Sequence, residues 1–227
     1  MDKMKIETNW DRWGAATGYL VCALGIAGAA FERGAPPATA PATEALAFFA
    51  QYRSELLAQS LMFVLSAGAY LWFYGSLRSY LERAEGGTGR LSTVVFGAGV
   101  TWAGLQMMFQ GAQVAVAMGA GGDMDPALAA MMGDLAYALS VIAYVPMAIM
   151  LAAVAVVSLR TGAFPAWLGW LSAGVAAANL FMSLGIVGDS GLLVPGGGLT
   201  YVLYALMPVW LVAVTTVMVV RLGKSAR

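Results

Sequence analysis

Long apolar runs separated by short polar segments dominate the chain. A helix needs about 20 apolar residues to cross the hydrocarbon core of a bilayer, and the pattern supplies six such runs. The predicted spans are 13–31, 55–80, 91–118, 127–158, 165–187 and 199–221. We therefore predict an all-α, polytopic membrane protein in which residues 1–227 form a single bundle of six transmembrane helices.

The distribution of basic residues predicts the topology of the bundle. Cytoplasmic loops of membrane proteins carry an excess of Lys and Arg. If the N-terminus is cytoplasmic, only Arg33 and Arg53 of the 12 basic residues fall on the outer side. The opposite orientation reverses this bias, so we expect both termini in the cytoplasm.

The connection between the first two spans allows two interpretations. Thr43 and Glu44 are typical of a helix start. The apolar residues Leu46, Phe48 and Phe49 that follow would suit a short helix lying on the membrane surface. Alternatively, the second transmembrane helix begins early and includes this segment.

Composition excludes several classes of function. Hydrophobic residues make up 60% of the 227 residues and charged residues 11%, against about 25% charged residues in soluble domains. The 12 basic and 12 acidic residues balance, which gives no basic surface for nucleic acid. Without histidine, and with the single cysteine Cys22, a Ser-His-Asp triad, an internal disulfide and most metal sites are excluded. We predict no cofactor, no metal and no nucleic-acid partner.

Polar residues inside the spans suggest a candidate site. Three glutamines of the third span follow i, i+4, i+7 spacing, which places them on one helix face. By the topology above, nearly all polar residues of the spans lie in the outer half of the bundle. If these faces converge, they line a polar cavity open to the outside. The candidate ligand-binding residues are Asp134, Gln106, Gln110, Asn179, Glu55, Gln59, Gln113 and Tyr137; no catalytic residue is assigned.

The hypothesis of a polar cavity depends mainly on Asp134. An acid within hydrocarbon is costly and usually functional, so we expect the other helices to give it water, a proton or a partner. The glutamines have a simpler alternative role, because interhelical hydrogen bonds are common in membranes although each contributes only about 0.6 kcal/mol. Glu55 lies near the interface, where solvation or pairing with Arg53 would also explain it.

Small residues indicate close helix packing. Gly14 and Gly18 form a Gly-x-x-x-Gly pair in the first span, and Gly97, Gly99 and Gly104 make the third helix thin. Such faces let helix backbones approach closely in lipid. They would serve the bundle itself or a homo-oligomer.

Three motifs carry a family resemblance. They are the N-terminal Trp13-Gly14 pair, Phe73–Leu81 (FYGSLRSYL) and Thr161–Leu171 (TGAFPAWLGWL). On these the chain resembles a family of small six-span bacterial integral membrane proteins of unknown function. The resemblance implies a six-helix bundle in the bacterial cytoplasmic membrane and brings no activity or catalytic residue.

Three functions fit these features. The first is binding of a lipid or small amphiphile, or docking of a partner, in the outward-facing polar cavity. The second is a small proton-coupled transporter in which Asp134 takes up and releases the proton. The third is an intramembrane enzyme acting on lipids or isoprenoids, with Glu55 and Asp134 as acid and base. We favour the first, because the loops are short and no catalytic motif is present.

Overall fold

The computed structural model describes residues 2–34, 36, 41–187 and 198–225. Within these residues the chain is all-α, as predicted, with seven α-helices, one short 3-10 helix and no strand. The helices are α1 (Asp2–Ala29), α2 (Ala42–Gln51), α3 (Arg53–Glu85), α4 (Arg90–Gly119), α5 (Pro126–Thr161), α6 (Ala166–Met182), the 3-10 helix η1 (Ser183–Ile186) and α7 (Gly198–Ser225).

Five of the six predicted spans are confirmed as helices long and apolar enough to cross a membrane. They are α3, α4, α5, α6 with η1, and α7. The first predicted span is also helical. Its apolar part, from Trp13 to Ala29, covers only about 26 Å at 1.5 Å per residue, whereas the hydrocarbon core is about 30 Å thick. Helix length and hydropathy support a multi-pass membrane protein, and a full crossing by α1 stays a prediction.

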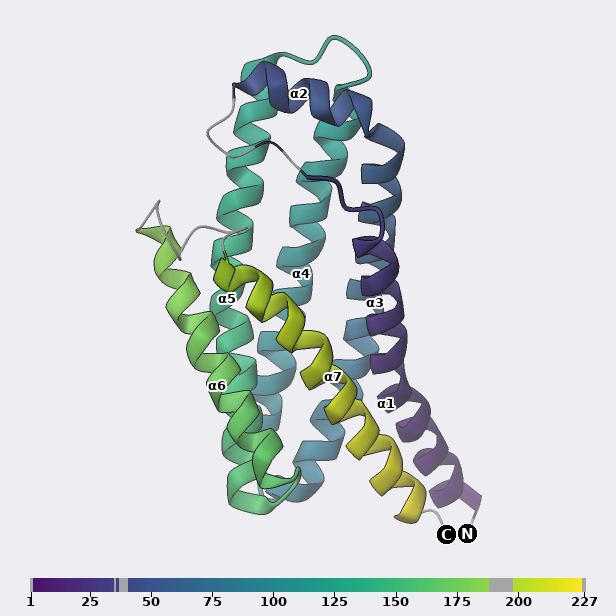
Figure 1. Ribbon diagram of the computed structural model, residues 1–227. Coiled ribbons are helices and arrows are strands. Elements are labelled where there is room, and N and C mark those ends of the chain that lie inside the picture. The colour runs from purple at the N-terminus through teal and green to yellow at the C-terminus, as the bar shows by residue number, and fades with distance from the viewer. Residues whose placement is uncertain (1, 35, 37–40, 188–197, 226–227) are drawn as a thin grey trace.

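The segment before the second span forms a separate helix, which decides between the two interpretations above. The backbone bends at Tyr52 (φ −106°, ψ 25°), and α3 starts at the next residue. Figure 1 shows α2 lying across the ends of α3, α4 and α5, roughly perpendicular to them. The half-buried Phe48 packs on the Tyr52 ring, with 5.1 Å between ring centroids. Helix α2 therefore covers the ends of three spans.

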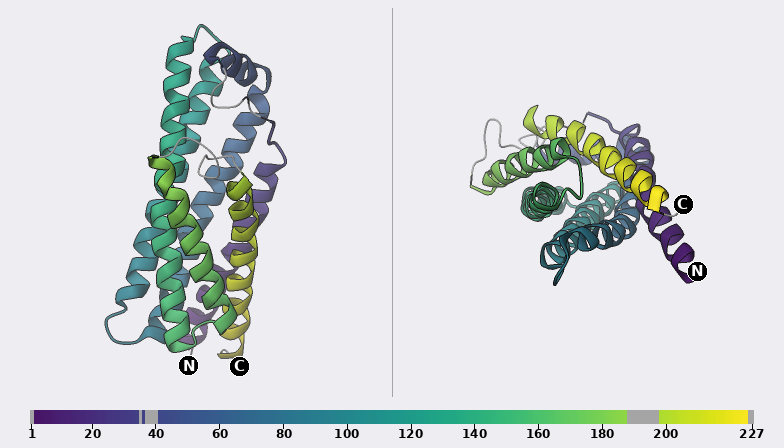
Figure 2. Two further views of the ribbon diagram at one scale, coloured as in Figure 1. Left: turned by 60° about the vertical axis from the view of Figure 1, so that its left-hand side comes forward. Right: turned by 90° about the horizontal axis from the view of Figure 1, so that it is seen from below.

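The six long helices form a ring in which neighbours in sequence are neighbours in space. Each of α1, α3, α4, α5, α6 and α7 packs on the next, and α7 closes the ring against α1. The view along the bundle in Figure 2 shows this arrangement. Both termini lie at one end, here called the inner end, and α2 lies at the other, here called the outer end. Figure 1 also shows that α6 and α7 stop well short of α2, so α3, α4 and α5 alone reach the outer end.

The glycine pair of α1 serves packing within the bundle. A Cβ at Gly14 would collide with the Ser76 hydroxyl of α3, and one at Gly18 would collide with the Thr215 hydroxyl of α7. A Cβ at Gly18 would also lie 3.1 Å from the Phe73 ring. Side chains on this face would push α1 away from both neighbours, so the predicted close approach is confirmed.

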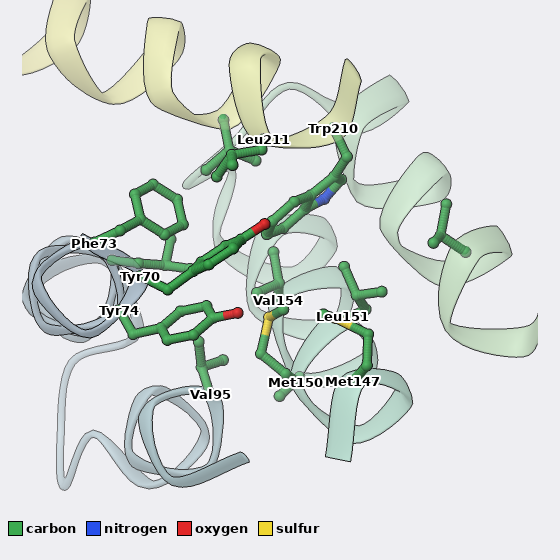
Figure 3. Close-up of a cluster of buried hydrophobic side chains, with 14 of the residues drawn as sticks. Tyr70, Phe73, Tyr74, Val95, Met147, Met150, Leu151, Val154, Trp210 and Leu211 are labelled. Carbon is green, nitrogen blue, oxygen red and sulfur yellow. The ribbon is translucent and has the colours of Figure 1, made fainter. Parts of the chain in front are cut away.

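Large aromatic side chains fill the centre of the ring. Tyr70 stacks on Tyr74, with 5.2 Å between centroids, and meets the edge of Trp102 at 5.0 Å. Figure 3 shows the Tyr70 ring reaching toward Trp210 of α7, while the Tyr74 ring points toward α5. Gly99 makes room for this stack, because a Cβ there would lie 2.8 Å from the Tyr74 ring.

Hydrogen bonds from Arg221 anchor the inner end of α7 to the α5–α6 connection. Arg221 Nη1 donates to the carbonyl oxygens of Gly162 (3.0 Å) and Ala163 (2.5 Å) in the α5–α6 connection. The Tyr80 hydroxyl of α3 donates to the same Ala163 oxygen at 2.8 Å. These bonds join α3, α7 and the α5–α6 connection. Charge-assisted hydrogen bonds of this kind are stronger than neutral ones.

Candidate functional site

Gln113, on the glutamine face of α4, contacts α3. Gln113 Nε2 donates to Gln59 Oε1 (3.0 Å) and to Ser60 Oγ (3.1 Å). Gln59 and Ser60 are buried. We call Gln59, Ser60, Gln110 and Gln113 the outer amide cluster. Both donor hydrogens of the Gln113 amide are used in holding α3 to α4, which is the simpler role considered above.

Gln110 is the most enclosed member of the outer amide cluster. Its side chain is 5% exposed, and its Oε1 finds no hydrogen-bond partner among the described residues. Gln106, one turn further inward on the same face, is half-buried. An unpaired buried acceptor costs about 1–3 kcal/mol, so this cluster is not fully satisfied by protein groups.

Asp134 is not buried, and this part of the sequence prediction is wrong. The residue lies on the exposed surface of α5, next to the exposed Leu135. Arg160, near the inner end of the same helix, is 26 residues away, or about 39 Å along the axis. With Arg160 at the inner boundary of a hydrocarbon core about 30 Å thick, Asp134 lies beyond the core on the outer side. An acid in that position reaches headgroups or water and needs no buried partner.

Two further predicted residues, Glu55 and Asn179, form hydrogen bonds within their own helices. Glu55 is half-buried and accepts a hydrogen bond from Ser54 Oγ at 2.8 Å, whereas Arg53 donates to the Ala117 carbonyl oxygen of α4 at 3.1 Å. Pairing of Glu55 with Arg53 is therefore not observed. Asn179 is buried on α6, and its amide donates to the Val175 carbonyl oxygen of its own helix at 2.8 Å.

Tyr137 is half-buried on α5, one turn inward from Asp134. The structure thus brings Gln59 and Gln113 together, with Gln110 on the same face, and leaves Asp134 on the surface. Ligand binding by any of the eight residues stays a prediction.

A groove with a different lining lies between α1 and α3 in the inner half of the bundle. Its volume is about 400 Å³. One residue of α1 and five of α3 line it: Asp11, Leu71, Trp72, Gly75, Ser76 and Ser79. We call it the inner groove. A Cβ at Gly75 would meet nothing within 4 Å, so this glycine opens the groove.

The polarity of the inner groove changes along its length. Trp72 and Leu71 form its apolar part, and Trp72 is 66% exposed. One to two turns further inward, Ser76 and Ser79 contribute hydroxyls, and the Ser79 hydroxyl donates to the Gly75 carbonyl oxygen at 3.2 Å. The groove therefore passes from apolar to polar in the direction of the inner end.

An ion pair lies at the polar end of the inner groove. Arg83 Nη2 of α3 donates to Asp11 Oδ2 of α1. Side-chain exposure is 55% for Arg83 and 25% for Asp11. Because Arg83 follows Ser79 by four residues, its side chain lies on the same face of α3. The two charges stay side by side and partly open to solvent.

Sequence reasoning missed the inner groove although a signal was present. Trp72, Gly75, Ser76 and Ser79 follow i, i+3, i+4, i+7 spacing, which places them on one helix face. The pattern joins a large aromatic residue to three small ones, and it contains none of the acids and amides that mark the outer half. Pairing of Asp11 with Arg83 joins residues 72 positions apart, which no local pattern reveals.

Comparison with protein-family models, curated proteins and solved structures finds no match.

Proposed function

We propose that the protein binds one lipid, or an amphiphile of similar shape, in the inner groove. The observation that carries the proposal is the change of polarity along the groove. An amphiphile has the same order of parts, with a polar headgroup at the membrane boundary and an apolar chain toward the bilayer centre. The groove has a volume of about 400 Å³ and is open to the surroundings.

The length of the groove suits one leaflet. Arg83 and Leu71 are 12 residues apart on α3, which is about 18 Å along the helix axis. Half of a hydrocarbon core about 30 Å thick is about 15 Å. A headgroup at Arg83 would therefore place its acyl chain beside Trp72 and Leu71. By the basic-residue bias, this leaflet is the cytoplasmic one.

The groove replaces the outward-facing cavity as the favoured site. Gln113 already uses its amide hydrogens between helices, and Asp134 is exposed on the bundle surface. The transporter and enzyme hypotheses both required Asp134 inside the bundle. Because Asp134 lies on the surface, the physical argument for both hypotheses no longer applies, and no other observation favours them.

Filling the groove tests the proposal. Gly75→Phe adds a ring at a groove position where a Cβ meets nothing within 4 Å. Gly97→Phe is the matched control, because Gly97 is equally free of neighbours and lies exposed on α4. Each full-length protein would be purified in a mild detergent and examined by native mass spectrometry for a retained lipid-sized mass.

We expect wild type and Gly97→Phe to keep one lipid-sized adduct through a detergent wash that removes surrounding lipid, and Gly75→Phe to lose it. Equal retention by all three proteins, or no adduct on any of them, would overturn the proposed function.

A further inference from the structure

At the polar end of the inner groove, a negatively charged and a positively charged side chain lie in contact. Asp11 lines the groove, and Arg83 is bonded to it. A guanidinium has five N–H donors, and a carboxylate has about four acceptor positions. The single hydrogen bond between them leaves spare capacity on both groups. Their partial exposure leaves these remaining positions accessible to a ligand.

We propose that the inner groove selects phospholipids whose headgroup carries a primary ammonium, as ethanolamine phospholipids do. The ammonium would donate to Asp11, and the lipid phosphate would accept from Arg83. This inference rests on the proposed function and adds the class of headgroup. It goes beyond lipid binding in general, because a headgroup must carry both a phosphate for Arg83 and an N–H donor for Asp11 to bond to both members of the ion pair.

Other headgroups satisfy the pair less well. A glycerol headgroup offers its phosphate to Arg83 and brings no positive charge to Asp11. A choline headgroup carries a positive charge, but its quaternary nitrogen has no N–H to donate, so it forms no charge-assisted hydrogen bond with the carboxylate. The distinction between ethanolamine and choline therefore depends on Asp11, and retention of any phospholipid depends on Arg83.

The position of the pair agrees with headgroup binding. Trp10 and Trp13 flank Asp11 on α1 and are 66% and 74% exposed. Exposed tryptophans are enriched at the level of lipid headgroups. Ser79, one turn from Arg83 toward the bilayer centre, gives the groove a hydroxyl at the depth of the ester region of the lipid.

The first test uses wild-type protein only, so it is independent of folding defects. The full chain is mixed with equal amounts of ethanolamine, N-methylated ethanolamine, choline and glycerol phospholipids with identical acyl chains. Native mass spectrometry then reports the retained adducts. We expect ethanolamine to exceed choline by about three- to fivefold, the effect of one partly exposed ion pair, with methylated forms between them.

The second test assigns the preference to the two residues. Asp11→Asn should remove the preference for ethanolamine over choline, and Asp11→Glu should retain it. Arg83→Gln should lower retention of all phospholipids about equally. The ion pair Arg78–Glu82 on the same helix (3.6 Å, side chains 41% and 44% exposed) does not line the groove. Glu82→Gln and Arg78→Gln are therefore the matched controls and should change neither ratio nor amount.

The outcomes separate this inference from the function on which it rests. If wild type retains a lipid that Gly75→Phe loses, but all headgroups bind equally, the headgroup inference is wrong and the proposed function stands. If Asp11→Asn keeps the ethanolamine preference, the inference is also wrong. If Gly75→Phe retains lipid as wild type does, the proposed function itself fails.

Discussion

The inner and outer ends of the bundle use polar residues in different ways. At the inner end, Arg221 joins α7 to the α5–α6 connection, and Asp11 pairs with Arg83 beside an open groove. At the outer end, Gln113 joins α3 to α4 through neutral amides and a hydroxyl. Polar side chains that look like a site in the sequence hold helices together, whereas three of the six residues that line the groove suited to a ligand are small.

The difference has a physical reason. Six helices meet at the inner end, and its charged side chains are partly exposed, so solvent lowers the free-energy cost of their charges. Only α3, α4 and α5 reach the outer end, beneath α2. Three helices leave few neighbours for each polar group, so their amides pair with one another. Four substitutions test this comparison, from the largest expected effect to the smallest.

Gly99→Ala should lower stability most. The new Cβ would lie 2.8 Å from the Tyr74 ring, which is fully buried. Overpacking of this kind costs about 1–3 kcal/mol, and we expect the upper part of that range. Gly97→Ala is the control, since its Cβ meets nothing within 4 Å and alanine favours the helix. Unfolding by sodium dodecyl sulfate in mixed micelles would measure both; equal stabilities would contradict the packing described for Tyr74.

Arg221→Ala should lower the free energy of unfolding by about 1.5 kcal/mol, the lower end of the range of about 1.5–3 kcal/mol for hydrogen bonds to charged groups, because Arg221 is exposed and solvent weakens its bonds. The loss frees α7 from the carbonyl oxygens of Gly162 and Ala163. Arg160→Ala, exposed at the same end of the bundle, should have a much smaller effect. The same unfolding assay applies. Equal free energies of unfolding for the two variants would show that Arg221 does not stabilise the packing of α7.

Gln113→Leu should lower the free energy of unfolding by about 1 kcal/mol, because it removes two interhelical hydrogen bonds of about 0.6 kcal/mol each. Gln106→Leu, half-buried on the same face, is the control and should cost less. Lipid retention should stay at the wild-type level in both variants, because the outer amide cluster lies far from the inner groove. Loss of bound lipid in Gln113→Leu alone would move the site back to the outer end.

Asp134→Asn should change stability by less than about 0.5 kcal/mol, as surface substitutions usually do. The residue is exposed, and among the described residues no hydrogen bond or salt bridge to its carboxylate is found. Lipid retention and, in proteoliposomes, proton movement should also match wild type. A large change in any of the three would show that Asp134 works inside the bundle after all.

Hydropathy was sufficient to predict the long helices, because a spanning segment must be apolar along its whole length. The spacing of Gln106, Gln110 and Gln113 was also sufficient to place them on one face. The burial of Asp134 was mispredicted for a related reason. Helix α5 is apolar on all sides, so its sequence does not show which side faces the other helices.

The interhelical contacts were the least predictable part. Arg221 binds backbone carbonyl oxygens of Gly162 and Ala163, and every residue type offers such an acceptor. The inner groove likewise depends on how α1 crosses α3 at Gly14 and Ser76. The spacing of residues in the sequence allows this crossing but does not specify it. Its one local signal was the small-residue face of α3 beside Trp72.

Photo-crosslinking with a phospholipid that carries its reactive group on the upper acyl chain tests the central claim most directly. After reconstitution and irradiation, peptide mass spectrometry locates the modified residues. The account predicts modification concentrated on the α3 segment from Trp72 to Ser79. Modification concentrated around Gln110 and Gln113, or spread evenly over exposed faces such as that of Gly97 on α4, would contradict it.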